Sequence, residues 1–283
     1  MLTRRFFLAT AGSTAALTAA GAAAYGYATQ IEPHWVQTVH RPLPVRALPP
    51  DLEAKTLVQL SDIHVGHRVD DGYVLSVFDH VRSLDPDIVV ITGDFVSHYR
   101  GIVDQAARVY PNLPKGRFAT LGIFGNHDYG KRSQNPVLAG VLQDIFDHAG
   151  LTILQNRSID IEGLRIIGLD DRWGPYFDPA PIMATVRAGE PVVVLSHNPD
   201  TVDLPIWGEF DGWILAGHTH GGQCKPPFLP PPLLPVYNKR YVAGAYELAG
   251  NRSLYINRGV GHLLKARFNA RPEVTVFSLT RAA

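Results

Sequence analysis

Side chains that can bind metal ions follow five apolar runs of the sequence, each at the point where the run ends. In chain order, the motifs are Ser61-Asp62-Ile63-His64, Gly93-Asp94, Gly125-Asn126-His127-Asp128, Ser196-His197 and Gly217-His218-Thr219-His220. Carboxylate and imidazole ligands without thiolates suit Mn, Fe or Zn. Residues two apart in an extended segment face the same side, so the D-x-H and H-x-H spacings can each direct two ligands into one cavity. The pattern therefore predicts a metal site built from several strand ends.

Taken singly, each motif has an ordinary structural explanation. A D-x-H pair can be a helix cap or a hydrogen-bonded surface pair, and a histidine after a strand is often a satisfied polar residue. Five such ends in one chain, supplying only Asp, His and Asn, favour a shared metal site. The glycines at positions 93, 125 and 217 agree with this interpretation, because they let the backbone turn sharply and bring the next side chain close to an ion.

The apolar runs have the length of buried strands, and helix-like stretches separate several of them. Strands are predicted at 56–60, 88–92, 118–124, 164–169, 192–195 and 213–216. Helices are predicted at 73–84, 102–110, 137–149 and 181–188. This alternation predicts an α/β body with its site at the carboxyl ends of the strands. Residues 241–248, 254–257 and 274–279 are predicted as strands without helices between them, which indicates an antiparallel or mixed sheet.

The order D-x-H, G-D, G-N-H-D/E, H and G-H-x-H resembles the calcineurin-like metallophosphoesterase superfamily over about residues 55–279. The resemblance implies an α/β fold, namely a four-layer α/β/β/α sandwich of two mixed sheets. It also implies two divalent metal ions per chain, either Mn, Fe or Zn. By the same resemblance, one ion is held by Asp62, His64 and His220, the second by Asn126, His197 and His218, and Asp94 bridges both.

The resemblance further implies a hydrolase of phosphate esters, in which a metal-bridging hydroxide attacks phosphorus in line. His127 is not needed as a ligand, and the family pattern makes it the residue that stabilises the transition state or protonates the leaving oxygen. The alternative is a buried histidine that orients the loop at Asn126. Asp128 is expected to anchor this loop rather than to carry chemistry.

The residues after Gly93-Asp94 depart from one branch of the superfamily and so restrict the activities to be expected. Ser/Thr protein phosphatases of the superfamily follow G-D with a V-D-R-G-type run, whereas Phe95-Val96-Ser97-His98 follows here, which disfavours that activity. The run 217–223 and the tail 271–276 are instead similar to a branch of small bacterial exported phosphodiesterases. We therefore expect hydrolysis of an envelope-associated phosphodiester. A phosphomonoesterase, or a metal-stabilised envelope binding protein without turnover, are the alternatives.

The N-terminus has the composition of an export signal. Residues 1–5 are basic and residues 6–31 carry no charge. Thr3-Arg4-Arg5-Phe6-Phe7-Leu8 resembles the twin-arginine (Tat) signal, which predicts contact with the Tat export machinery and a location in the periplasm or on the outer face of the cytoplasmic membrane. An ordinary secretory signal is the alternative. The expected organisation is a Tat-type signal peptide or N-terminal anchor at 1–30, a Pro-rich lead-in at 31–54 and a single metallophosphoesterase domain at 55–283.

Composition excludes several other classes of protein. The 26 basic residues balance 26 acidic ones, so no basic field for nucleic acid is evident, and the single cysteine excludes a disulfide scaffold. Residues 226–236 contain six prolines and read as a stiff loop. The large apolar residues of this loop either contact lipid or an apolar substrate, or the loop packs back over the core. Association with a membrane or the cell wall is therefore left open beside the phosphoester substrate.

Replacing Arg4 and Arg5 by lysine tests the export prediction. The predicted ligands come from residues 62 to 220 and meet only in the folded chain, and the Tat route carries folded proteins. The variant should therefore remain in the cytoplasm as active enzyme, measured as phosphodiesterase activity in cytoplasmic and exported fractions. Unchanged export would refute the Tat assignment and leave the enzyme assignment intact.

Overall fold

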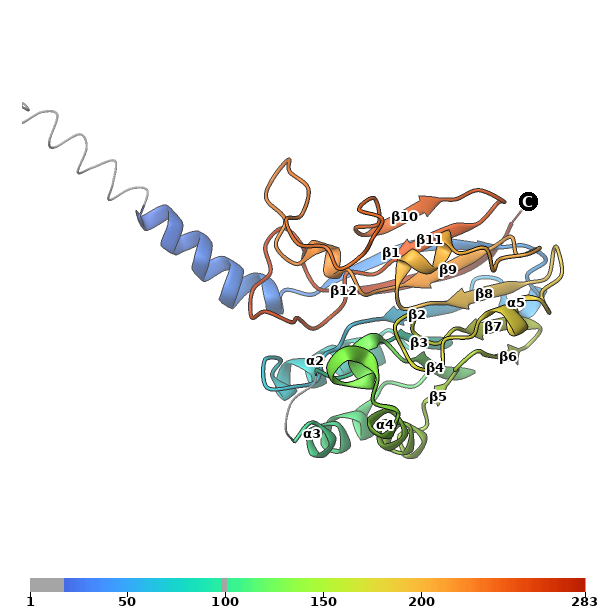
Figure 1. Ribbon diagram of the computed structural model, residues 1–283, viewed down its shortest axis with the longest axis horizontal. Coiled ribbons are helices and arrows are strands. Elements are labelled where there is room, and N and C mark those ends of the chain that lie inside the picture. The colour runs from blue at the N-terminus through green and yellow to red at the C-terminus, as the bar shows by residue number, and fades with distance from the viewer. Residues whose placement is uncertain (1–17, 98–100, 283) are drawn as a thin grey trace, which may run out of the picture.

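Two six-stranded sheets lie face to face at the centre of the molecule, with helices and loops on their outer faces (Figure 1). The computed structural model describes residues 18–97 and 101–282. Side chains from both sheets, among them Leu57, Val193 and Phe277, form the buried cluster between them. The predicted sandwich of two mixed sheets is confirmed.

The first sheet has the strand order β1-β12-β2-β3-β4-β5. Its strands are β1 (Gln37–Val45), β12 (Glu273–Arg281), β2 (Thr56–Leu60), β3 (Ile88–Thr92), β4 (Ala119–Ile123) and β5 (Thr152–Ile153). Strands β2 to β5 are parallel, whereas β12 runs antiparallel to β2 and parallel to β1. Successive residues point to opposite faces, so Leu57 packs between the sheets and Val58 packs against the helices.

Three helices cover the outer face of this sheet: α2 (Asp71–Ser83), α3 (Ile102–Val109) and α4 (Pro136–His148). The starts of two of them follow from the sequence. Asp70 caps α2 by accepting the Tyr73 N–H, and Asn135 caps α4 by accepting the Leu138 N–H. Proline at the first position of α4 fits the same rule, because that residue needs no backbone donor.

The second sheet has the order β10-β11-β9-β8-β7-β6. Its strands are β10 (Gly244–Glu247), β11 (Ser253–Ile256), β9 (Trp213–Ala216), β8 (Val192–Leu195), β7 (Leu164–Gly168) and β6 (Arg157–Ile161). Strands β7, β8, β9 and β11 are parallel, and the edge strands β6 and β10 are antiparallel to their neighbours. The outer face is covered by α5 (Ala180–Met183), the 3-10 turn Pro199–Asp203 and loops that bury Trp207 and Phe210.

The helix predicted at 181–188 is wrong in its length, since α5 ends at Met183. Thr185 and Val186 are β-branched and lower helix propensity. The Thr185 hydroxyl also donates to the Ile182 carbonyl at 2.7 Å, so the chain leaves the helix in a tight turn.

The segment expected as a lead-in, 31–54, contributes a strand to the first sheet. Strand β1 pairs with β12 over its whole length, from Gln37 with Glu273 to Val45 with Arg281. The strand was not predicted because Pro42 and Pro44 are unfavourable inside a sheet. Strand β1 lies at the edge of the sheet, where proline is tolerated. Leu43 and Val45 are buried between the sheets, so the folded body begins before residue 55.

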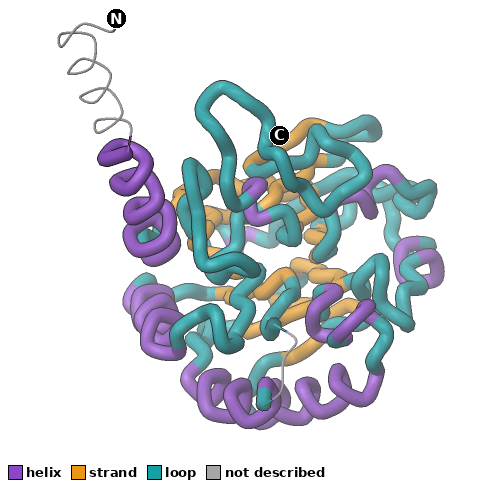
Figure 2. The backbone as a smooth tube through the Cα atoms, turned by 60° about the vertical axis from the view of Figure 1, so that its left-hand side comes forward, coloured by secondary structure: helices purple, strands orange, loops and turns teal. Residues whose placement is uncertain are grey.

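Ahead of β1, the chain forms a helix that projects from the body (Figure 2). Residues 18–26 are helical and lead into a π-helical turn at Tyr27–Ile31. Among residues 18–97 and 101–282, no helix has both the length and the apolar character needed to cross a membrane. The twin-arginine motif at Arg4 and Arg5 lies outside the described residues.

Replacing Leu43 by alanine tests whether β1 belongs to the folded body. Leu43 is 0% exposed, so its truncation should lower the free energy of unfolding by about 2–5 kcal/mol. The matched control is His40→Ala, because His40 lies on the same strand with an exposed side chain and should change stability by less than about 0.5 kcal/mol. Equal denaturant midpoints for both variants would contradict the placement of β1.

Candidate metal centre

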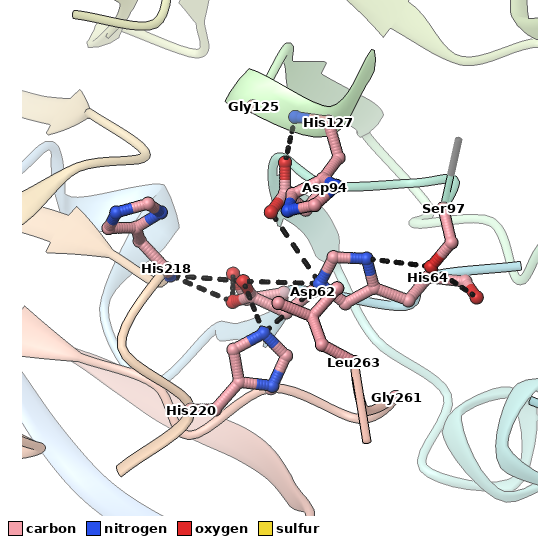
Figure 3. A network of polar contacts seen from close by, with 12 residues as sticks. Asp62, His64, Asp94, Ser97, Gly125, His127, His218, His220, Gly261 and Leu263 are labelled. Atoms are coloured by element: carbon pink, nitrogen blue, oxygen red, sulfur yellow. Dashed lines mark hydrogen bonds and ion pairs between the residues drawn. The ribbon is translucent and has the colours of Figure 1, made fainter. Parts of the chain in front are cut away.

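The seven predicted ligands lie together at one edge of the two sheets. Asp62 and His64 follow β2, Asp94 follows β3 and Asn126 follows β4, whereas His197, His218 and His220 follow β8 and β9. The carboxyl ends of parallel strands meet at the same sheet edge, which explains why residues distant in sequence converge. All seven side chains are buried, with Asn126 the most exposed at 9%. Figure 3 shows how several of them point toward one another.

The ligand atoms form two clusters. Those of Asp62, His64 and His220 lie within 4.8 Å of one another, as do those of Asp94, His197 and His218. In the first cluster, His220 Nε2 is 3.0 Å from His64 Nε2 and 3.3 Å from Asp62 Oδ1. In the second, His197 Nε2 is 3.1 Å from His218 Nδ1 and 3.3 Å from Asn126 Oδ1. The grouping follows the division into two sites that the family pattern implies.

Asp94 lies between the clusters. Its Oδ2 is 3.5 Å from His64 Nε2 and 3.3 Å from His197 Nε2, so one oxygen faces a ligand nitrogen of each cluster. Its Oδ1 accepts the His127 backbone N–H at 2.8 Å. This position is compatible with the predicted bridging carboxylate.

Hydrogen bonds on the far sides of two histidines fix their tautomers. His197 Nδ1 lies 2.7 Å from the Thr92 carbonyl, and His218 Nε2 lies 2.7 Å from the Pro235 carbonyl. A carbonyl only accepts, so these ring nitrogens carry hydrogen, and in their neutral forms the rings direct lone pairs from His197 Nε2 and His218 Nδ1 into the site. Two lone pairs 3.1 Å apart repel each other unless a cation lies between them. The donor set therefore fits a metal ion.

Electrostatics lead to the same conclusion. Burial lowers the pKa of His64, and it lowers the pKa of His218 to about 3, so both rings are neutral and able to bind a cation. Burial is the largest single influence on His197 and opposes its charge, but the carboxylates of Asp94, Asp62 and Asp171 together outweigh burial and raise the pKa of His197 well above its usual value. Without a metal, the site therefore stabilises a proton in the position that a metal ion would otherwise fill.

The backbone at the site is held in an unusual conformation. The ligands with left-handed φ are Asp62 (50°), His64 (52°), Asp94 (55°), His218 (71°) and His220 (52°). Residues other than glycine rarely adopt this backbone region, because it is sterically unfavourable. Backbone strain of this kind concentrates at functional sites. The surrounding structure must therefore hold these residues in place.

Glycines and a C-terminal loop provide this support. A Cβ at Gly217 would lie 1.8 Å from Ser61 Oγ, so only glycine lets these two strand ends approach. The Ser61 hydroxyl donates to Asp62 Oδ2 at 2.6 Å. The loop after β11 braces the same segment, because the Val260 and Gly261 N–H groups donate to the carbonyls of Ser61 and Asp62. Backbone contacts of this kind leave no signal in the sequence.

Arg267 is a supporting residue that sequence reasoning missed. Its side chain is 0% exposed, and its guanidinium donates to the carbonyls of Arg258, Gly259 and Ala270. A buried arginine that holds the loop after β11 thereby supports the end of β2. Its position in an irregular segment gave no pattern from which this role could be predicted.

His127 lies at the open side of the centre, half-buried, with its ring 5.0 Å from that of His64. It lines a cavity of about 460 Å³ together with Asn126, Arg68, Lys131 and Arg132. Asp128 anchors the loop as expected, because its carboxylate accepts the N–H groups of Gly125 and Val96.

Comparison with known proteins identifies the family. Residues 55–222 match the family model described as calcineurin-like phosphoesterase. The chain is 31% identical to YkuE, a metallophosphoesterase of Bacillus subtilis strain 168, covering 99% of this chain and 98% of that protein. It is 31% identical to the phosphodiesterase YaeI of Escherichia coli K12 (99% and 100% covered). It is 28% identical to the UDP-2,3-diacylglucosamine pyrophosphatase LpxG of Chlamydia trachomatis (93% and 96% covered).

The chain therefore belongs to the calcineurin-like phosphoesterase family, as its motifs predict, and is a metal-dependent hydrolase of phosphate esters. Two clusters of metal-competent side chains are present in the described residues. The assignment of individual ligands and of His127 remains a prediction.

Replacing Asp94 by asparagine tests the bridge. The change removes the charge shared by both clusters, so we expect loss of about one bound ion per chain and at least a 100-fold fall in activity. Metal content is measured by mass spectrometry after loading with Mn. Asp79→Asn, which neutralises an exposed carboxylate on α2, is the control and should bind metal as the parent protein does. Two retained ions and full activity in the Asp94 variant would refute the bridging role.

Proposed function

We propose that this protein is a binuclear phosphodiesterase of the cell envelope, exported by the Tat route. The observation that carries the binuclear proposal is the position of Asp94, whose Oδ2 lies within 3.5 Å of a ligand nitrogen in each cluster. When bound there, two divalent cations, Mn, Fe or Zn, would lower the pKa of a shared water and neutralise charge on the phosphoryl oxygens. Asp62, His64 and His220 would hold one ion, and Asn126, His197 and His218 the other.

The remaining groups of the site suit an anionic phosphoester. Arg68, Lys131 and Arg132 line the cavity that opens at His127, and their positive charge complements a phosphate group. Asp94 holds the His127 backbone, which keeps the imidazole at the cavity wall beside the ligands. From there His127 can donate a proton to the leaving oxygen.

The relatives support a diester or pyrophosphate substrate. YaeI carries the name phosphodiesterase, and LpxG is named for cleaving the pyrophosphate of UDP-2,3-diacylglucosamine. In a phosphodiester the phosphorus carries two organic substituents, and in a pyrophosphate diester it carries one organic substituent and a further phosphoryl group. Hydrolysis releases one of these substituents, whose oxygen His127 can protonate. The export proposal rests on the paired arginines, Arg4 and Arg5, and on the uncharged segment after them.

Turnover of two chromogenic compounds tests the proposal. With Mn added, the protein should release nitrophenol faster from bis-p-nitrophenyl phosphate than from p-nitrophenyl phosphate. A preference for the monoester would identify a phosphomonoesterase instead. Metal binding without release from either compound would identify a non-catalytic binding protein and refute the proposal.

Replacing His127 by alanine separates proton donation from metal binding. The variant should keep its metal content and lose about 10²–10⁴-fold in kcat. The loss should shrink for diesters with better leaving groups, because these need less protonation. His148→Ala, an exposed histidine on α4, is the control and should leave kcat unchanged. An equal loss for every leaving group would contradict proton donation by His127.

A further inference from the structure

A second cavity, of about 470 Å³, is lined in part by the predicted ligand His220. Its walls include an apolar set composed of Pro232, Leu233, Leu234, Pro235, Leu263 and Leu264. In the part of the chain that the structure describes, no Asp, Glu, Lys or Arg lines this cavity, and its polar lining is limited to Thr219, His220, Gln223 and Cys224. Such a volume and lining are typical of a site for an apolar ligand.

This apolar cavity adjoins the cavity that opens at His127. Leu263 lines both cavities, and His220 forms part of the apolar wall. At the opposite wall, the Pro235 carbonyl accepts the hydrogen bond from His218 Nε2. A molecule that reaches from one cavity into the other therefore passes the metal centre.

The wall that carries Leu233 and Leu234 is rigid. Prolines stiffen this segment, and its C-terminal end is tied down where the Asp200 carboxylate accepts the N–H groups of Tyr237 and Asn238 at 2.6 and 3.0 Å. Lys239 Nζ also donates to the Leu234 carbonyl at 2.7 Å. The cavity is thus a preformed feature of the fold.

Apolar surface continues outward from the cavity. Leu233 is 73% exposed and Phe228 is fully exposed. Phe228 and Tyr27 line one further hollow, which joins this loop to the projecting N-terminal helical segment. Exposed apolar side chains therefore lie near the cavity as well as inside it.

From this arrangement we infer that the cavity binds the hydrocarbon chain of an amphipathic phosphoester, while the phosphate lies at the metal centre. The inference rests on the proposed function and names the substrate class. One cavity is lined by basic residues and the other by apolar residues, which matches the polar and apolar ends of such a molecule. Arg68, Lys131 and Arg132 suit an anionic or polar group on one side of the centre, and the leucines suit a chain on the other side.

A series of p-nitrophenyl alkyl phosphates tests this inference, with methyl, butyl and octyl esters used below their micelle-forming concentrations. The nitrophenol leaving group is the same throughout, so kcat/KM reports on the alkyl chain. We expect kcat/KM to increase about twofold per methylene, or about 100-fold from the methyl to the octyl ester. This increase corresponds to half the transfer free energy of a fully buried methylene.

Two variants localise the effect. The double variant Leu234→Gln/Leu264→Gln makes the cavity polar and should reduce the octyl-to-methyl ratio of kcat/KM below about tenfold. Leu229→Gln is the matched control, because Leu229 is 60% exposed on the same loop but does not line the cavity. It should keep the full ratio.

Binding of octyl phosphate, measured by calorimetry against methyl phosphate, gives a readout that does not depend on turnover. The parent protein should prefer the octyl compound by at least tenfold, and the double variant should not. Equal kcat/KM for all three esters in the parent protein, or an unchanged ratio in the double variant, would overturn the inference while leaving the phosphodiesterase intact. Failure to hydrolyse even the methyl ester would instead refute the proposed function.

Discussion

Lone pairs from buried carboxylates and imidazoles face one another in the site, and this arrangement requires positive charge between them. The tautomers of His197 and His218 are fixed by carbonyls that can only accept, which directs two nitrogen lone pairs toward each other at 3.1 Å. Desolvation makes such repulsion costly. The site can relieve it by taking up a proton at His197 or, more effectively, divalent cations. Metal affinity is therefore a property of how the ligands are held.

The fold holds the ligands with two rigid sheets and a small number of close backbone approaches. The strands end at the same edge, and the ligands follow in left-handed conformations that single strands would not maintain. These turns are fixed by the close approach of Gly217 to Ser61 and by the loop after β11, which Arg267 holds in place. The strain is stabilised by the packing between the sheets, where Leu57 and Phe277 are fully buried. In this way a stable core supports an otherwise unfavourable site.

Most strands and the candidate metal residues could be predicted from the sequence, because the metal-competent side chains follow the apolar runs that form the strands. Apolar runs such as 88–92 are followed closely by metal-competent residues such as Asp94, so one pattern predicts both the strands and the candidate site. Strand β1 was missed because Pro42 and Pro44 contradict strand propensity, and only its edge position makes them acceptable. The tautomers at His197 and His218 depend on backbone carbonyls, which are present at every residue. The apolar cavity joins residues from 219–224 and 232–235 to Leu263 and Leu264, and no local pattern relates these segments.

A crystal structure of the Mn-loaded protein, with anomalous scattering recorded for the metal, tests the central claim most directly. The account predicts two anomalous peaks about 3.5–4 Å apart. One peak should lie among Asp62, His64 and His220, the other among Asn126, His197 and His218, with Asp94 in contact with both. A single peak, or two peaks that do not share Asp94, in crystals of active protein would contradict it.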